Sequence, residues 1–89
     1  MNPIKVRVTC MRSLTQQEST LDFWVLLKPD STVSSLLQEL EKSRGLRINF
    51  KEKNITILVN GRPLDTLKGL KTKLKDLDKV FIMPIIGGG

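Results

Sequence analysis

The last three residues of this 89-residue chain, Gly87–Gly89, form a terminal run without side chains. The α-carboxylate that follows such a run is sterically unhindered, and glycine adopts positive and negative φ angles with similar ease. The segment can therefore extend through a narrow channel of a partner enzyme and present the Gly89 carboxylate for activation. Glycines at a terminus are also a common and meaningless end of a chain. The residues that precede them must decide between the two interpretations.

The rest of the chain offers few groups for catalysis or metal binding. The sequence has no histidine and one cysteine, Cys10, which argues against a metal site and a Cys-His nucleophile pair. It contains neither a Gly-x-x-x-x-Gly-Lys-Ser/Thr phosphate loop nor a Gly-x-Ser-x-Gly elbow. Asp76 and Asp78 lie among lysines, which is typical of a solvated turn. We therefore expect a substrate or a binder without metal, and no enzyme.

Composition predicts one small soluble domain, because 39% of the residues are hydrophobic and 27% are charged. No run approaches the roughly 20 apolar residues of a membrane span, and the N-terminus lacks the apolar core of a secretory signal. A single cysteine gives no internal disulfide and no sign of an oxidising compartment. We expect a cytoplasmic monomer that does not contact membranes.

A net charge of +6 raises the hypothesis of a nucleic-acid or acidic partner. Five of the fifteen basic residues fall in one short stretch, at Lys68, Lys71, Lys73, Lys75 and Lys79. Single-strand binding requires exposed aromatic residues among the basic ones, and the sequence shows no such pattern. We interpret the stretch as a solvated lysine-rich face and do not expect direct nucleic-acid binding.

Two segments near the N-terminus alternate apolar and polar residues, which predicts half-buried strands. They are Ile4–Cys10 and Leu21–Lys28, separated by a polar segment from Ser13 to Thr20 that we interpret as a loop. In the second strand Trp24 and Leu26 share the face opposite the core. We interpret Trp24 as covering the sheet surface, in preference to marking a partner site.

The middle of the chain predicts one helix. Val33, Leu36, Leu37 and Leu40 recur at helical spacing and form one apolar stripe. Thr32 is the expected N-cap, and Gly45 is the expected left-handed residue after the last turn. A helix with a single apolar stripe must cover one face of a sheet, so the pattern predicts a two-layer α+β domain.

Three further strands are expected in the C-terminal half. Asn54–Val59 is rich in β-formers and ends in an Asn60-Gly61 turn, after which Arg62–Asp65 can hold a short edge strand. Val80–Met83 is the last strand, and Pro84, which lacks an N–H group, ends its ladder.

Three segments, in this order and before terminal glycines, resemble the β-grasp, ubiquitin-like proteins. Lys28–Val33 is similar to the approach to the ubiquitin helix, Ile57–Arg62 to a strand and turn of the sulfur carriers, and Thr72–Pro84 to their closing segment. The similarity is greatest to the ubiquitin-related modifier and the molybdopterin synthase small subunit, and smaller to the thiamine sulfur carrier. Leu77 departs from the family, which often has glycine there in an Asp-Gly-Asp turn, and Gly87 adds a third terminal glycine.

The resemblance implies a β-grasp fold: a mixed sheet of four to five strands, one helix across one face, and the first and last strands as parallel neighbours. It also implies a ubiquitin-like domain over residues 1–86 and a flexible glycine tail over residues 87–89. Gly88 and Gly89 match the family's glycine pair, so Gly89 would carry the reacting carboxylate.

The family's chemistry implies a partner adenylating enzyme of the ubiquitin-activating type, which uses ATP and magnesium while the chain itself binds no cofactor. Sulfur then replaces AMP to give a C-terminal thiocarboxylate, the sulfur donor of pathways such as tRNA thiolation or molybdopterin synthesis. In modifier members the activated end is joined to lysines of target proteins.

Alternation in the last strand also predicts a docking surface beside the tail. If Val80 and Ile82 face the core, Phe81 and Met83 point outward, beside Ile85 and Ile86 near the C-terminus. An apolar patch there would let the activating enzyme grip the domain and aim the carboxylate. The alternative is that Phe81 and Met83 pack under the neighbouring loop. The alternative function is a basic β-grasp interaction domain that contacts RNA and whose glycines are incidental.

Overall fold

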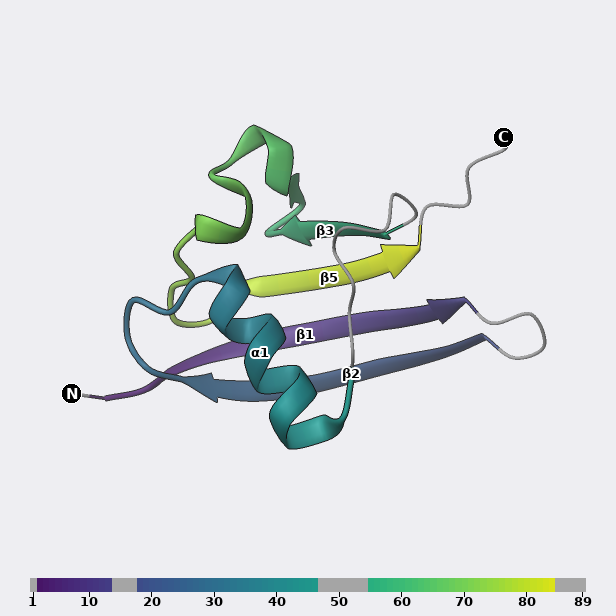
Figure 1. The fold of residues 1–89 in the computed structure, drawn as a ribbon, viewed down its shortest axis with the longest axis horizontal. Coiled ribbons are helices and arrows are strands. Elements are labelled where there is room, and N and C mark those ends of the chain that lie inside the picture. The colour runs from purple at the N-terminus through teal and green to yellow at the C-terminus, as the bar shows by residue number, and fades with distance from the viewer. Residues whose placement is uncertain (1, 14–17, 47–54, 85–89) are drawn as a thin grey trace.

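The computed structural model describes residues 2–13, 18–46 and 55–84, which form a mixed five-stranded sheet crossed by one helix (Figure 1). The strand order is β2-β1-β5-β3-β4. Two short 3-10 helices, Leu64–Thr66 and Gly69–Lys71, lie between β4 and β5. The predicted fold class is confirmed.

The first two strands, β1 (Ile4–Ser13) and β2 (Glu18–Leu27), pair antiparallel over their full lengths. Their inward residues are buried as the alternation predicts, with Val6 and Val8 fully covered. The predicted loop from Ser13 to Thr20 is wrong at both ends, because Ser13 and Glu18–Thr20 belong to the strands. The ladder continues past the apolar pattern, since main-chain hydrogen bonds do not require apolar side chains.

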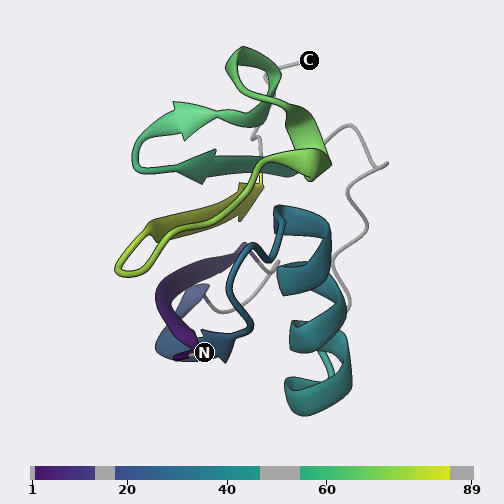
Figure 2. The same cartoon turned by 90° about the vertical axis from the view of Figure 1, so that its left-hand side faces the viewer.

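The helix, α1 (Val33–Arg44), begins and ends where the sequence predicts. The Thr32 hydroxyl accepts a hydrogen bond from the Ser35 amide at 3.2 Å, and the Ser35 hydroxyl accepts one from the Thr32 amide at 3.3 Å. Gly45 follows with φ of 67°, a left-handed angle that favours glycine. The helix lies on one side of the sheet (Figure 2) and buries Val33, Leu36 and Leu40 there.

The remaining strands are β3 (Ile55–Val59), β4 (Arg62–Pro63) and β5 (Lys79–Pro84). The predicted Asn60-Gly61 turn joins β3 to β4, with φ of 53° and 83° at its two residues. The short edge strand ends at Pro63, two residues before its predicted end, because the chain turns into a 3-10 helix that buries Leu64. The predicted start of β3 at Asn54 lies outside the described residues.

The last strand occupies the middle of the sheet. β5 pairs parallel with β1 and antiparallel with β3, as the resemblance implies. Val80 and Ile82 are buried under α1 within one apolar core. Because both neighbours hold β5 by hydrogen bonds, the segment that leads to the C-terminus is fixed as far as Pro84. No helix among the described residues is long and apolar enough to cross a membrane.

Candidate functional site

The outer face of β5, away from α1, carries the two predicted docking residues that the structure describes. Phe81 and Met83 are half-buried there, while Val80 and Ile82 between them are buried in the core. Phe81 lies between Thr9 of β1 and Leu58 of β3 in the strand register. The predicted alternation of this strand is confirmed, and Phe81 sits at the centre of the open face.

A shallow cavity of about 250 Å³ opens on this face beside Phe81. Its lining combines the Phe81 ring with polar and charged side chains, namely Arg7, Thr9, Asp22 and Lys79. An apolar floor with a charged rim can receive an apolar side chain of a partner and hydrogen-bond its surroundings. We call Phe81 and these four neighbours the Phe81 cavity.

An ion pair forms one wall of the Phe81 cavity. The Arg7 guanidinium donates two hydrogen bonds to the Asp22 carboxylate, from Nε to Oδ1 and from a terminal nitrogen to Oδ2, each 2.8 Å long. The hydrogen bond from Arg7 holds the pKa of the Asp22 carboxyl below its ordinary value, with further contributions from the Arg7 charge and from Thr9. The same pair raises the pKa of Arg7.

Acid should break the ion pair between Arg7 and Asp22. Because the Asp22 pKa is lower in the folded protein, the pair stabilises the fold above the ordinary carboxyl pKa of about 3.9 and loses this contribution as pH falls through the folded value. An NMR titration should give Asp22 a midpoint below 3.9, and Arg7→Gln should move that midpoint up. An unchanged midpoint in the variant would show that Arg7 does not set it.

The other predicted site residues, Gly88, Gly89, Ile85 and Ile86, lie outside the described residues, and their roles stay predictions. The same holds for the boundary between a domain over residues 1–86 and a tail over residues 87–89. Covalent geometry sets one limit, since five residues after Pro84 span at most about 18 Å. The Gly89 carboxylate is therefore tethered within that distance of the end of β5.

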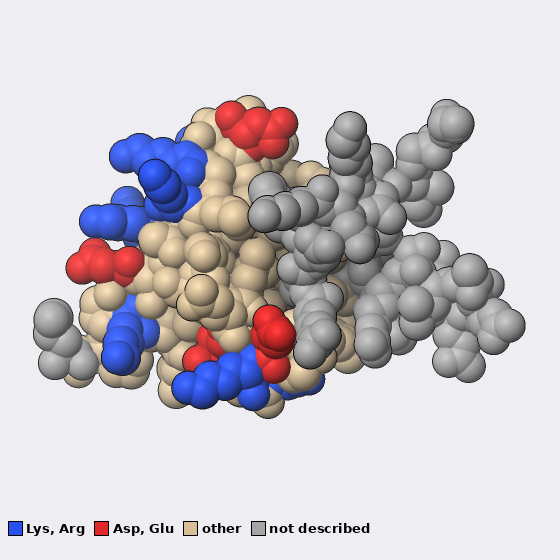
Figure 3. Space-filling view, in the orientation of Figure 1, with Lys and Arg blue, Asp and Glu red and all other residues tan. Residues whose placement is uncertain are grey.

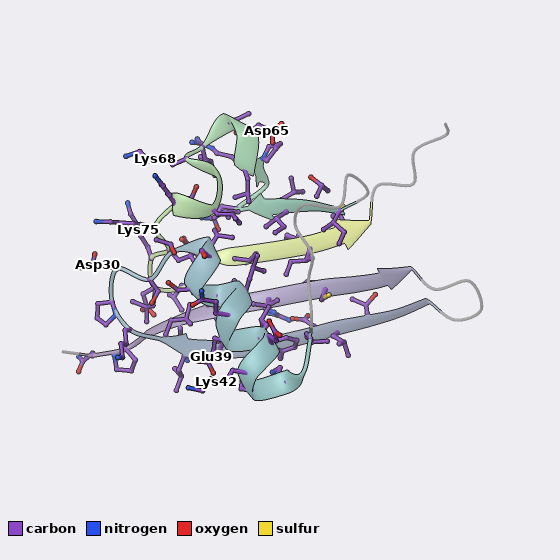
Figure 4. All side chains as sticks on the ribbon, in the orientation of Figure 1. Asp30, Glu39, Lys42, Asp65, Lys68 and Lys75 are labelled. Carbon is purple, nitrogen blue, oxygen red and sulfur yellow. The ribbon has the colours of Figure 1, made fainter. Side chains whose placement is uncertain are left out.

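The basic stretch leads up to the start of β5, and its last member, Lys79, also lines the Phe81 cavity. Its lysines are all exposed, as predicted for a solvated face. Figure 3 shows basic side chains gathered at the end of the molecule where β5 begins, and Figure 4 shows Lys68 and Lys75 projecting outward there. Among the described residues no cluster of histidine, cysteine and acidic side chains could hold a metal ion.

Asp76 and Asp78 stabilise the turn before β5 through hydrogen bonds. Asp76 accepts a hydrogen bond from the Lys5 amide at 2.8 Å, and Asp78 accepts from the Lys75 amide and the Asn60 side chain at 2.8 and 2.9 Å. These bonds fasten the turn to β1 and to the Asn60-Gly61 turn. Their interpretation as turn carboxylates agrees with this geometry.

Sequence reasoning missed the polar half of the Phe81 cavity. Arg7 and Asp22 are distant in sequence, and only the pairing of β1 with β2 and β5 brings them beside Phe81. It also missed that Trp24 lies among basic side chains, with its ring centroid 5.2 Å from Lys5 Nζ and 5.7 Å from the Arg7 guanidinium carbon. The sequence signal that could have revealed this arrangement is the alternation of β1 and β2, which places charged residues on the outer face of both strands.

The central β5, its open outer face and the single helix across the other face define a ubiquitin-like β-grasp protein. The model of the ThiS family matches residues 12–89. The chain therefore belongs to the ThiS family. No curated protein matches it significantly.

Solved structures share the fold. The HVO 2177 protein of Haloferax volcanii is 24% identical with a TM-score of 0.67, covering 99% of this chain and 89% of its own. Small archaeal modifier protein 1 of Methanosarcina acetivorans is 24% identical with a TM-score of 0.63, covering 100% of both chains. The ubiquitin of Caldiarchaeum subterraneum is 17% identical with a TM-score of 0.54, covering 99% of this chain and 100% of its own.

Proposed function

We propose that this protein delivers its Gly89 carboxylate to a partner adenylating enzyme and then serves as a sulfur carrier, a protein modifier or both. The observation that supports this most directly is the position of β5. It is the central strand, it carries the Phe81 cavity on its open face, and it ends five residues before the C-terminus. A partner that grips Phe81 thereby fixes the origin of the tail.

The chemistry requires activation because a carboxylate is a poor acyl donor at neutral pH. In the partner, a carboxylate oxygen of Gly89 attacks the α-phosphorus of ATP and pyrophosphate leaves, giving an acyl-adenylate. A sulfur nucleophile then displaces AMP and leaves a thiocarboxylate, or a target lysine receives the acyl group as an amide. ATP and magnesium belong to the partner, and this chain contributes the docking surface and the acyl end.

The recipient is either a sulfur-accepting pathway enzyme or the lysines of target proteins. The intact mass of the protein purified from its native cells tests the proposal. We expect exchange of one C-terminal oxygen for sulfur, larger conjugates joined through Gly89, or both. If neither product forms with the activating enzyme, ATP and a sulfur donor present, the proposal fails.

Removing the ring of Phe81 should weaken docking. Central aromatic contacts typically contribute about 1–3 kcal/mol, so Phe81→Ala should raise the KM of the activating enzyme for this protein about 10- to 100-fold. The value of kcat should change little, because the contact is made equally before and during the chemical step. Pyrophosphate exchange measured against protein concentration gives both constants.

Lys68→Ala is the matched control, because Lys68 is exposed in the turn between the two 3-10 helices and does not line the Phe81 cavity. It should leave KM unchanged at fixed ionic strength. An equal rise of KM in both variants would point to general electrostatic steering and against a specific role of Phe81.

A further inference from the structure

Three large apolar side chains of the described residues are strongly exposed, and each belongs to a residue that neighbours Lys5 through its side chain, its strand pairing or its main chain. Trp24 is 46% exposed, Leu26 is 64% exposed and Leu77 is 60% exposed. Leu26 is the cross-strand partner of Lys5. Trp24 has its ring centroid 5.2 Å from Lys5 Nζ, and the Leu77 amide donates a hydrogen bond to the Lys5 carbonyl at 2.6 Å. We call Lys5, Arg7, Trp24, Leu26 and Leu77 the Lys5 patch.

Leu77 makes the patch more than a chance cluster. Its φ is 70°, a left-handed angle that is unfavourable for any residue with a Cβ atom and unusual for leucine. Its exposed side chain adds little to the core that could offset this strain. A strained backbone that displays an apolar side chain to solvent is the combination expected at a recognition site.

The turn that presents Leu77 is held firmly. Asp76 accepts a hydrogen bond from the Lys5 amide, and the Asp78 carbonyl accepts one from the Arg7 amide at 2.9 Å. Figure 2 shows the segment that leads into β5 looping out on the side of the sheet away from α1. Leu77 is therefore displayed in a fixed position, which lowers the entropic cost of binding a partner.

Trp24 is also held before any partner arrives. Its ring contacts the cations of both Lys5 and Arg7, and Arg7 is fixed by its two hydrogen bonds to Asp22. An ordered indole on the same face of β2 as Leu26 offers a rigid apolar contact area.

The Lys5 patch lies at the start of β5, whereas the C-terminus follows its end. A six-residue strand separates its first and last residues by about 17 Å. The Lys5 patch therefore adjoins the Phe81 cavity, with which it shares Arg7, and extends from it away from the end of β5 that leads to the tail.

We propose that the Lys5 patch docks a protein partner whose contact surface has apolar side chains surrounded by carboxylates. Charge supports this occupant, because Lys5 within the patch is exposed, and so are Lys75 and Lys79, each two residues from Leu77 in the sequence. The nearby carboxylates of Asp22 and Asp76 are already hydrogen-bonded to Arg7 and to the Lys5 amide.

Two other occupants fit less well. A second copy would bring another net charge of +6 against the same basic rim. Single-stranded RNA would find one aromatic plane in the patch, while Leu26 and Leu77 offer no surface for base stacking.

The test uses the full chain labelled with ¹⁵N and three synthetic probes: the acidic peptide Glu-Asp-Leu-Phe-Asp-Glu, its basic counterpart Lys-Lys-Leu-Phe-Lys-Lys, and oligouridylate. The acidic peptide should shift the amide signals of Lys5, Leu26 and Leu77 and the indole signal of Trp24, and added salt should weaken the effect. The basic peptide should shift none of them. Absent or scattered shifts with the acidic peptide, or equal shifts with both peptides, would overturn the proposal.

Two further outcomes assign the patch to another occupant and also overturn the proposal: tighter binding of oligouridylate at Trp24, or a concentration-dependent dimer that protects Trp24.

Variants separate the effect of the patch on binding from its effect on folding. Leu77→Gly should raise the denaturation midpoint, because glycine accepts the left-handed angle, and should weaken acidic-peptide binding about tenfold. Leu26→Ser should weaken binding without the gain in stability, and Lys68→Gln, outside the patch, should change neither by a comparable amount. A Leu77→Gly protein that binds as tightly as the parent would exclude the role of Leu77.

Discussion

Deletion of Gly88 and Gly89 should abolish the thiocarboxylate and all conjugates while leaving the fold intact. The shortened chain ends at Gly87, so its carboxylate falls short by about 7 Å of chain length. Misplacement of a reacting group by about 1 Å can cost about 100-fold in rate, and a deficit of this size should lower adenylation by at least that factor. Pyrophosphate exchange by the activating enzyme and intact mass both report the loss.

Gly87→Ala is the matched control. It preserves both the terminal glycine pair and the length of the tail, so the protein should still be adenylated. Neither change should alter the denaturation midpoint, because β5 ends at Pro84. Persistence of thiocarboxylate or conjugates after loss of Gly88 and Gly89 would contradict the proposed role of the C-terminus.

Truncation of Leu36 should cost a large part of the stability of this domain. Leu36 lies at the centre of the stripe by which α1 covers the sheet, and its side chain is fully buried. Leu36→Ala removes buried contacts and leaves a cavity, which typically costs about 2–5 kcal/mol. The free energy of unfolding of a small domain is about 5–15 kcal/mol, so a loss of this size should lower the urea midpoint sharply.

Leu26→Ala tests the same chemical change on the other side of the sheet. Leu26 is largely exposed, so its truncation should change the free energy of unfolding by less than about 0.5 kcal/mol. Similar losses for the two variants would mean that α1 does not hold the core as described.

Features that depend on residues close together in the sequence, such as helix ends and strand faces, could be predicted well. Thr32 and Gly45 bound α1 because caps act on amides and carbonyls within one turn. Alternation in β1 and β5 assigned Val8 and Val80 to the core, because successive strand residues face opposite sides. The strand ends were less predictable: Glu18–Thr20 carry no apolar pattern, and only pairing with β1 makes them a strand.

Local sequence patterns were enough to predict the helix, the strand faces, the Asn60-Gly61 turn and the family signature that ends in glycine, because each depends on neighbouring residues or on their order. Only the packed sheet shows that Arg7, Asp22 and Phe81 share one cavity and that Trp24, Leu26 and Leu77 are neighbours of Lys5. Periodicity gives the face of each strand but neither its neighbours nor its register. Those follow from long-range pairing, whose free energy belongs to the whole sheet.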